Sequence, residues 1–307
     1  MNARSSASLA LSALLAVGIT ASAWGQPAGT LRVVSDQTVG GVAFPESVAY
    51  DPNAKALYVS EFVSKLDPVL KDGQGRIGKV SLDGKILEQK FLPAAGGEPL
   101  NKPKGIWVRG ERLWVTDIDV VWVFDLKTKR GRKAALPGVT FANDPAVADN
   151  VLYVSDNRSD RLVRVEPADF LNAKGEPKVT TVFSGMQIHP NGLYPARDGM
   201  LRIVGFLAPD KPKGVFALGV GGQIKSLSDP IGRLDGVYEM RDGTLLVTDW
   251  NTGSLFSWSE AGGVHRLATG FKGPADFCVM PGEGNSMTVV VPDLPMSQVR
   301  FIRLRRG

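Results

Sequence analysis

The chain has 307 residues, of which 43% are hydrophobic and 22% are charged, and it contains 35 Gly and 20 Pro. This composition excludes an intrinsically disordered chain and a collagen, and its turn-rich character favours a β protein over a helical bundle. The formal net charge of +5 is small and its basic residues are mostly scattered, so we expect no nucleic-acid partner.

The chain contains few cysteine and histidine side chains, which limits the kinds of metal site that it can form. The chain has one cysteine, Cys278, and two histidines, His189 and His265. These numbers exclude an internal disulfide, a zinc site built from cysteines and a site built from three histidines. Any metal site must therefore consist mainly of oxygen ligands.

Residues 1–23 have the pattern of a secretory signal peptide. Arg4 provides the positive charge that is typical of the first region of a signal peptide. Residues 9–19 form an apolar run that is too short to span a bilayer. The sequence Ala21-Ser22-Ala23 matches a cleavage site. We expect cleavage after Ala23, export to the periplasm or the medium, and a mature domain over residues 24–307. The alternative is a buried N-terminal helix.

The rest of the chain repeats a pattern of four β-rich segments with a period of roughly 40–58 residues. The six units cover 45–92, 103–138, 143–185, 190–230, 234–271 and 274–304. The sixth unit lacks a fourth segment, and the strand expected at 30–37 can fill that position. The pattern predicts an all-β fold, a six-bladed β-propeller with four-stranded blades whose ring is closed by the N-terminal strand.

Two of the connections between second and third strands are lengthened, at 62–74 and at 206–212. In a propeller these connections lie on the face where the innermost strands begin, so we expect them to form the rim of a central funnel. Residues 73–80 (GQGRIGKV) partly match a phosphate-binding loop. Val80 stands where that motif needs Ser or Thr, and a β segment follows instead of a helix, so we expect no nucleotide binding.

Polar residues stand where the first strand of each unit begins, and these strands should line the propeller axis. In chain order they are Glu46, Lys104, Asn143 with Asp144, Asn191, Asp235 and Asp276. Carboxylates that face a narrow channel are costly unless a cation neutralises them. Glu46, Asn191 and Asp235 together would offer two charges and an amide oxygen to a hard divalent ion, with Ca²⁺ expected and Mg²⁺, Mn²⁺ or Zn²⁺ as alternatives. The other interpretation is that these residues only cap strands and turns.

With these motifs the sequence resembles the senescence-marker-protein, gluconolactonase and luciferin-regenerating-enzyme family of six-bladed propellers. Glu46 in PESVAYD matches the family's first metal ligand, and Asn143 in FANDPAV matches a residue near metal and substrate. Asn191 in PNGLY and Asp235 in LDGVYE match two further metal ligands, of which the aspartate is also the catalytic base. The chain departs from the family at Ser47, where a glycine is usual, and has Lys104 at a funnel position.

The resemblance implies metal-dependent hydrolysis of a lactone or a similar ester. Asp235 would activate water, and the metal would polarise the carbonyl group. We expect Asn143, Asp144, Lys104 and His189 to contact a small-molecule substrate, although His189 also suits a solvent-facing loop. The alternative function is a non-catalytic propeller that binds a ligand or a protein on its funnel face, through Lys104 and residues 62–74.

Overall fold

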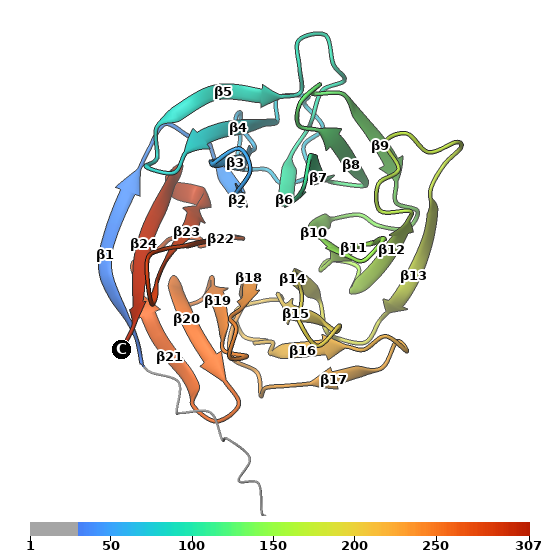
Figure 1. Ribbon diagram of the computed structural model, residues 1–307. Helices are drawn as coiled ribbons and strands as arrows, with labels where there is room; N and C mark the ends of the chain where they lie inside the picture. The colour runs from blue at the N-terminus through green and yellow to red at the C-terminus, as the bar shows by residue number, and fades with distance from the viewer. Residues whose placement is uncertain (1–29) are drawn as a thin grey trace, which may run out of the picture.

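The computed structural model describes residues 30–307, so the signal peptide predicted for residues 1–23 lies outside the described residues. Six antiparallel sheets of four strands each are arranged around a central axis (Figure 1). The predicted six-bladed β-propeller is confirmed. Among residues 30–307 the one helical segment is the short 3₁₀ turn η1 (Leu294–Met296), and no helix is long and apolar enough to cross a membrane.

The first three blades follow one another directly along the chain. Blade one contains β2 (Pro45–Asp51), β3 (Ala56–Glu61), β4 (Arg76–Ser81) and β5 (Ile86–Leu92). Blade two contains β6 (Pro103–Arg109), β7 (Arg112–Asp117), β8 (Val120–Asp125) and β9 (Gly131–Ala135). Blade three contains β10 (Ala142–Ala148), β11 (Val151–Asp156), β12 (Arg161–Glu166) and β13 (Lys178–Ser184).

Blades four and five continue the same order. Blade four contains β14 (Pro190–Pro195), β15 (Leu201–Gly205), β16 (Val215–Leu218) and β17 (Ile224–Ser226). Blade five contains β18 (Leu234–Glu239), β19 (Leu245–Asp249), β20 (Ser254–Ser259) and β21 (Gly263–Ala268). Blade six contains β22 (Cys278–Pro281), β23 (Ser286–Asp293) and β24 (Gln298–Arg306), and its fourth strand is β1 (Leu31–Val39).

The two ends of the described chain meet in blade six. Strand β1 pairs antiparallel with β24, from Leu31 opposite Arg306 to Val39 opposite Val299. The guanidinium group of Arg300 in β24 also forms a salt bridge with Asp36 in β1. The predicted ring closure by the N-terminal strand is therefore confirmed. It covers an edge of β24 that would otherwise expose unpaired backbone groups.

The apolar core lies between the blades. Each of six clusters of buried side chains combines residues of two neighbouring blades. For example, Val204 and Val215 of blade four pack with Val237 and Val247 of blade five. Because apolar burial stabilises the ring at the blade interfaces, the axis itself is available for polar side chains from the innermost strands.

Candidate functional site

The innermost strands share an irregularity at their starting residues. In each of the first five blades the pairing between the first and second strands shifts register, and the shifts fall at Pro45/Ser47, Pro103/Ile106, Ala142/Pro145, Pro190/Leu193 and Leu234/Val237. Such a shift leaves residues outside the regular ladder and redirects their side chains. The residues released in this way include Glu46, Lys104, Asn143, Asn191 and Asp235.

In four of these five blades a hydroxyl group on the second strand hydrogen-bonds to the irregular segment, whereas β15 of blade four contains no Ser or Thr. Ser155 Oγ accepts a hydrogen bond from the Asp144 N–H (2.9 Å) and donates one to the carbonyl oxygen of Asn191 in the next blade (2.6 Å). Thr248 Oγ1 likewise accepts from the Gly236 N–H (2.8 Å) and donates to the Ala275 carbonyl (3.1 Å). The hydroxyl groups therefore hold one blade's released segment and tie it to the next blade.

The acidic residue that follows each hydroxyl has a capping role. The carboxylates of Glu61, Asp117, Asp156 and Asp249 accept hydrogen bonds from backbone N–H groups that precede the innermost strands. Asp117, for example, accepts from the N–H groups of Asn101 (2.7 Å) and Lys102 (2.8 Å). These carboxylates belong to the repeat architecture and fix where each innermost strand begins.

Replacing Ser155 with Ala is expected to lower the free energy of unfolding by about 1–3 kcal/mol, because a buried N–H and a buried carbonyl group lose their partner. Chemical denaturation of the purified protein measures this loss. The matched control is Ser184→Ala on the exposed face of β13, which should change stability by less than about 0.5 kcal/mol. Equal effects of the two substitutions would contradict the role given to Ser155.

The released side chains meet at one cavity of about 560 Å³ on the funnel face. Glu46, Lys104, Asn143, Asn191 and Asp235 all line it. The two long connections contribute to its wall, and their lining residues are Phe62, Leu66, Pro68, Phe206, Leu207 and Ala208. The prediction that residues 62–74 and 206–212 form the rim is confirmed. We call this space the funnel cavity.

Five oxygen atoms on residues that line the funnel cavity are buried without a hydrogen-bond partner among the described residues. They are Glu46 Oε2, Asn143 Oδ1, Asn157 Oδ1, Asn191 Oδ1 and Asp235 Oδ1. The other carboxylate oxygen of Asp235, Oδ2, accepts a hydrogen bond of 2.8 Å from Trp250 Nε1. Buried polar atoms normally have a partner, so five such oxygens from four blades mark a place where something else should bind.

The carboxyl groups of this region resist ionisation. Burial, followed by the nearby Asp276 carboxylate, raises the pKa of Asp235 to about 8. Burial raises the pKa of Glu46 well above its ordinary value, with Asp235 adding to the shift and Lys104 opposing it. Crowded, desolvated carboxylates behave in this way when no cation compensates them.

Lys104 lies in the wall of the funnel cavity with its side chain fully buried. Burial lowers the pKa of its ammonium group to about 8, while Glu46 opposes that shift. The Nζ atom donates to the Lys102 carbonyl oxygen (3.3 Å) and lies 4.5 Å from the centre of the Phe141 ring. Among residues 30–307 it forms no salt bridge, so its charge is available to a ligand.

Asp144 and His189, two of the residues predicted to contact substrate, are not among those that line the funnel cavity, and neither is Asp276, a polar residue predicted at the axis. Asp144 and Asp276 line a second cavity further along the axis, where Asp144 Oδ2 accepts from the Leu193 N–H (2.6 Å) and Asp276 Oδ2 accepts from Ser47 Oγ (2.6 Å). The ring nitrogen Nδ1 of His189 donates to the Asn157 carbonyl oxygen at 2.8 Å, and His189 is not among the residues that line the funnel cavity.

Several lining residues were missed by the sequence analysis, Arg158, Arg233, Phe141 and Trp250 among them. A pattern in the repeats could have identified some of these lining residues. In five of the six blades, the residue directly after the second strand lines the funnel cavity, and these residues are Phe62, Asn157, Phe206, Trp250 and Leu294. Aligning the repeats on the ends of their second strands would have identified this ring of positions.

Among the described residues there is no group of three or more His, Cys, Asp or Glu side chains that could hold a metal ion. The oxygen set of the funnel cavity consists of two carboxylates and three amides, so it lies outside that definition. Carbonyl-type amide oxygens are nevertheless ordinary ligands of Ca²⁺ and other hard cations. The donor set therefore fits a hard divalent ion chemically.

No protein-family model matches the chain, and neither does any curated protein sequence. Solved structures match it well. A gluconolactonase from Xanthomonas campestris superposes with a TM-score of 0.63 over 91% of this chain and 99% of its own, at 16% identity. The resemblance to gluconolactonase-type propellers is confirmed in the fold.

Two further structures widen the comparison. Regucalcin, a calcium-binding protein from Agrobacterium tumefaciens, matches with a TM-score of 0.61 over 91% of this chain and 96% of its own, at 14% identity. Virginiamycin B lyase from Staphylococcus aureus matches at 0.58 over 89% of this chain and 99% of its own, also at 14% identity. Proteins with this fold thus differ in function, so the function of this chain has to be inferred from the residues of the funnel cavity.

Proposed function

We propose that this protein is a metal-dependent hydrolase that opens a lactone or a related ester in the funnel cavity. The observation that carries the proposal is the meeting of four buried, unpartnered oxygens from Glu46, Asn143, Asn191 and Asp235 in one cavity. A hard divalent cation bound by Glu46, Asn191 and Asp235 would give their oxygens a partner, and its charge would balance the two carboxylates. Ca²⁺ is the ion that this oxygen set favours most.

The residues proposed as ligands are Glu46, Asn191 and Asp235, with Asn143 beside them. When bound, a divalent ion at this position supplies Lewis-acid polarisation of the substrate carbonyl and stabilises negative charge on its oxygen. The buried setting strengthens that electrostatic effect, because little water competes for the charge.

Asp235 is the proposed general base. Trp250 Nε1 donates to its Oδ2 atom, which leaves Oδ1, on a residue that lines the cavity, without a hydrogen-bond partner among the described residues. From there Oδ1 can take a proton from a water molecule as the water oxygen bonds to the substrate carbonyl carbon. The ring C–O bond then breaks, the proton passes to the leaving oxygen, and a hydroxy acid results.

The other lining residues point to an anionic, partly apolar substrate. Lys104, Arg158 and Arg233 bring three cationic groups to the cavity, and aromatic side chains supply much of the remaining wall. The guanidinium carbon of Arg158 lies 4.1 Å from the centre of the Phe141 ring, and that of Arg233 lies 4.2 Å from the Phe206 ring. Stacking leaves the N–H edges free to bind a carboxylate.

Metal binding is tested first, without any substrate. Elemental analysis of the purified protein should find one divalent ion per chain, and chelation should lower the unfolding temperature. Restoring Ca²⁺ at ~100 times its Kd should stabilise the fold by about 3 kcal/mol. Glu46→Gln should weaken Ca²⁺ binding in calorimetry, whereas Glu260→Gln on the surface should not. A protein that neither holds nor binds a divalent ion would refute the proposal.

Activity is tested next with a panel of lactones and esters, with and without chelator. We expect turnover that is lost on chelation and regained with the metal. Stoichiometric binding of a lactone without turnover would instead favour the non-catalytic propeller, whose binding should depend on Lys104 and on residues 62–74.

We also propose that the protein acts outside the cytoplasm. The proposal rests on the signal-peptide pattern of residues 1–23. Cell fractionation followed by N-terminal sequencing of the mature protein tests it, with Trp24 as the expected first residue. A cytoplasmic chain that retains residues 1–23 would contradict it.

A further inference from the structure

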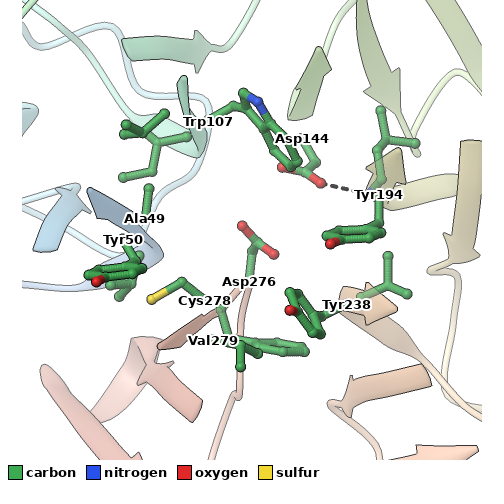
Figure 2. A pocket seen from close by; sticks show the side chains of 15 residues that line it. Ala49, Tyr50, Trp107, Asp144, Tyr194, Tyr238, Asp276, Cys278 and Val279 are labelled. Carbon is green, nitrogen blue, oxygen red and sulfur yellow. Dashed lines mark hydrogen bonds between the residues drawn. The ribbon is translucent and has the colours of Figure 1, made fainter. Parts of the chain in front are cut away.

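A second cavity, of about 210 Å³, lies further along the propeller axis than the funnel cavity. Besides Phe277, its wall contains four aromatic side chains, one each from β2, β6, β14 and β18: Tyr50, Trp107, Tyr194 and Tyr238. Figure 2 shows these side chains standing around the carboxyl groups of Asp144 and Asp276. We call this arrangement the aromatic collar.

Part of the collar is a continuous aromatic wall. The ring centres of Tyr194 and Tyr238 lie 5.0 Å apart, and those of Trp107 and Tyr194 lie 6.2 Å apart in an edge-on arrangement. All four aromatic residues are partly exposed, so the collar can be reached from solvent. A ring face carries partial negative charge and attracts cations that come within about 6 Å of its centre.

The two carboxyl groups inside the collar lack a cationic partner. Asp144 is 4% exposed and Asp276 is 9% exposed. Asp144 Oδ2 accepts from the Leu193 N–H, and among residues 30–307 no hydrogen bond is donated to Asp144 Oδ1. The described residues that line the cavity include no Lys, Arg or His. Buried carboxylates without a counter-charge are costly, and a bound cation would remove that cost.

We propose that the aromatic collar binds a small organic ammonium ion. The carboxylates of Asp144 and Asp276 would neutralise its charge, and the rings would contact its alkyl groups and attract the cation. An inorganic ion needs a shell of oxygen ligands, but most of this wall is aromatic or aliphatic. The size also suits a compact ligand, since an apolar cavity of about 150 Å³ admits benzene. This site is separate from the proposed hydrolytic one.

The test uses the full mature protein with its funnel site saturated by Ca²⁺. Calorimetry compares choline with 3,3-dimethylbutanol, its uncharged analogue of the same shape. Choline should bind at least about tenfold more tightly, because only the cation gains from the carboxylates and the ring faces. Equal affinity, or no binding of choline, would overturn the proposal.

Collar variants locate the binding. Trp107→Leu and Tyr194→Leu should each weaken choline binding by about 3- to 30-fold. Tyr194→Phe keeps the ring and should stay within about twofold of the wild type. Tyr153→Leu, in β11 outside the cavity, is the control and should leave the affinity unchanged.

Two outcomes would count against the collar as the site. If the Leu variants bind choline as the wild type does, the ligand binds elsewhere. If further Ca²⁺ displaces choline from the saturated protein, an inorganic ion occupies the carboxylates. Should one Leu variant fail to fold, the other Leu variant still locates the binding, and the comparison of choline with its neutral analogue still tests the need for a cation.

Discussion

Replacing Asp235 with Asn should lower kcat for lactone opening by about 10²- to 10⁴-fold, the range expected when a general base is removed. Asn has the same shape and can keep an oxygen toward Trp250 Nε1, which is 2.8 Å from Asp235 Oδ2. Its amide nitrogen cannot accept a proton from water. The loss should therefore appear in the chemical step, measured with a pH indicator on any lactone that the wild type opens.

The matched control is Asp242→Asn. Asp242 lies on the exposed surface and forms a salt bridge with Arg306, away from the funnel cavity. Its substitution should leave kcat within about twofold of the wild type, as expected for a residue outside the proton-transfer machinery. Thermal unfolding of both variants checks that they are folded, and metal analysis separates loss of the base from loss of the ion. Wild-type turnover by the Asp235→Asn protein would remove Asp235 from the mechanism.

Replacing Arg158 or Arg233 with Gln should lower kcat/KM for a carboxylate-bearing lactone by about 10- to 150-fold each, the loss expected for a hydrogen bond to a charged group. Among the described residues, neither guanidinium group forms a salt bridge, and Arg233 Nε is buried without a partner. Both are therefore free to bind an anion. Hydrolysis of a neutral lactone should change little, and steady-state kinetics on a charged and neutral pair measures the difference.

The matched control for the arginine variants is Arg266→Gln. Its guanidinium group also lies over an aromatic ring, that of Phe256 at 5.7 Å, but it stands on β21 at the outside of blade five. The Arg266→Gln substitution should change kcat/KM for neither the charged nor the neutral lactone. An equal loss on the charged and the neutral lactone for Arg158 or Arg233 would mean that these residues support the fold or the metal instead of recognising an anion.

The sequence predicted the fold nearly completely because the fold is a repeat. Each unit carries the same strand signals, so the number of blades and the missing sixth-blade strand could be counted, and β1 does pair with β24. The same counting placed Glu46, Asn143, Asn191 and Asp235 at equivalent positions, and the structure brings them to one cavity. Their roles as ligands and base remain predictions.

The repeat pattern could not predict the direction in which each side chain points. Asn143 and Asp144 are neighbours in the sequence, yet Asn143 lines the funnel cavity and Asp144 lines the aromatic collar. The pairing of β10 with β11 shifts register between Ala142 and Pro145, and Ser155 holds the Asp144 N–H in that segment. A register shift depends on contacts with another strand, so local sequence does not reveal it.

The amino-acid sequence by itself therefore determined the ring, its closure and the positions from which polar groups could reach the axis, because these follow from a repeated local pattern. Only the tertiary structure decided which of those groups share a cavity. Arg158 and Trp250 follow second strands of different blades, and they join Glu46 at the funnel cavity only because the ring brings distant turns together. Contacts of that kind are long-range, and they are set by how the blades pack against one another.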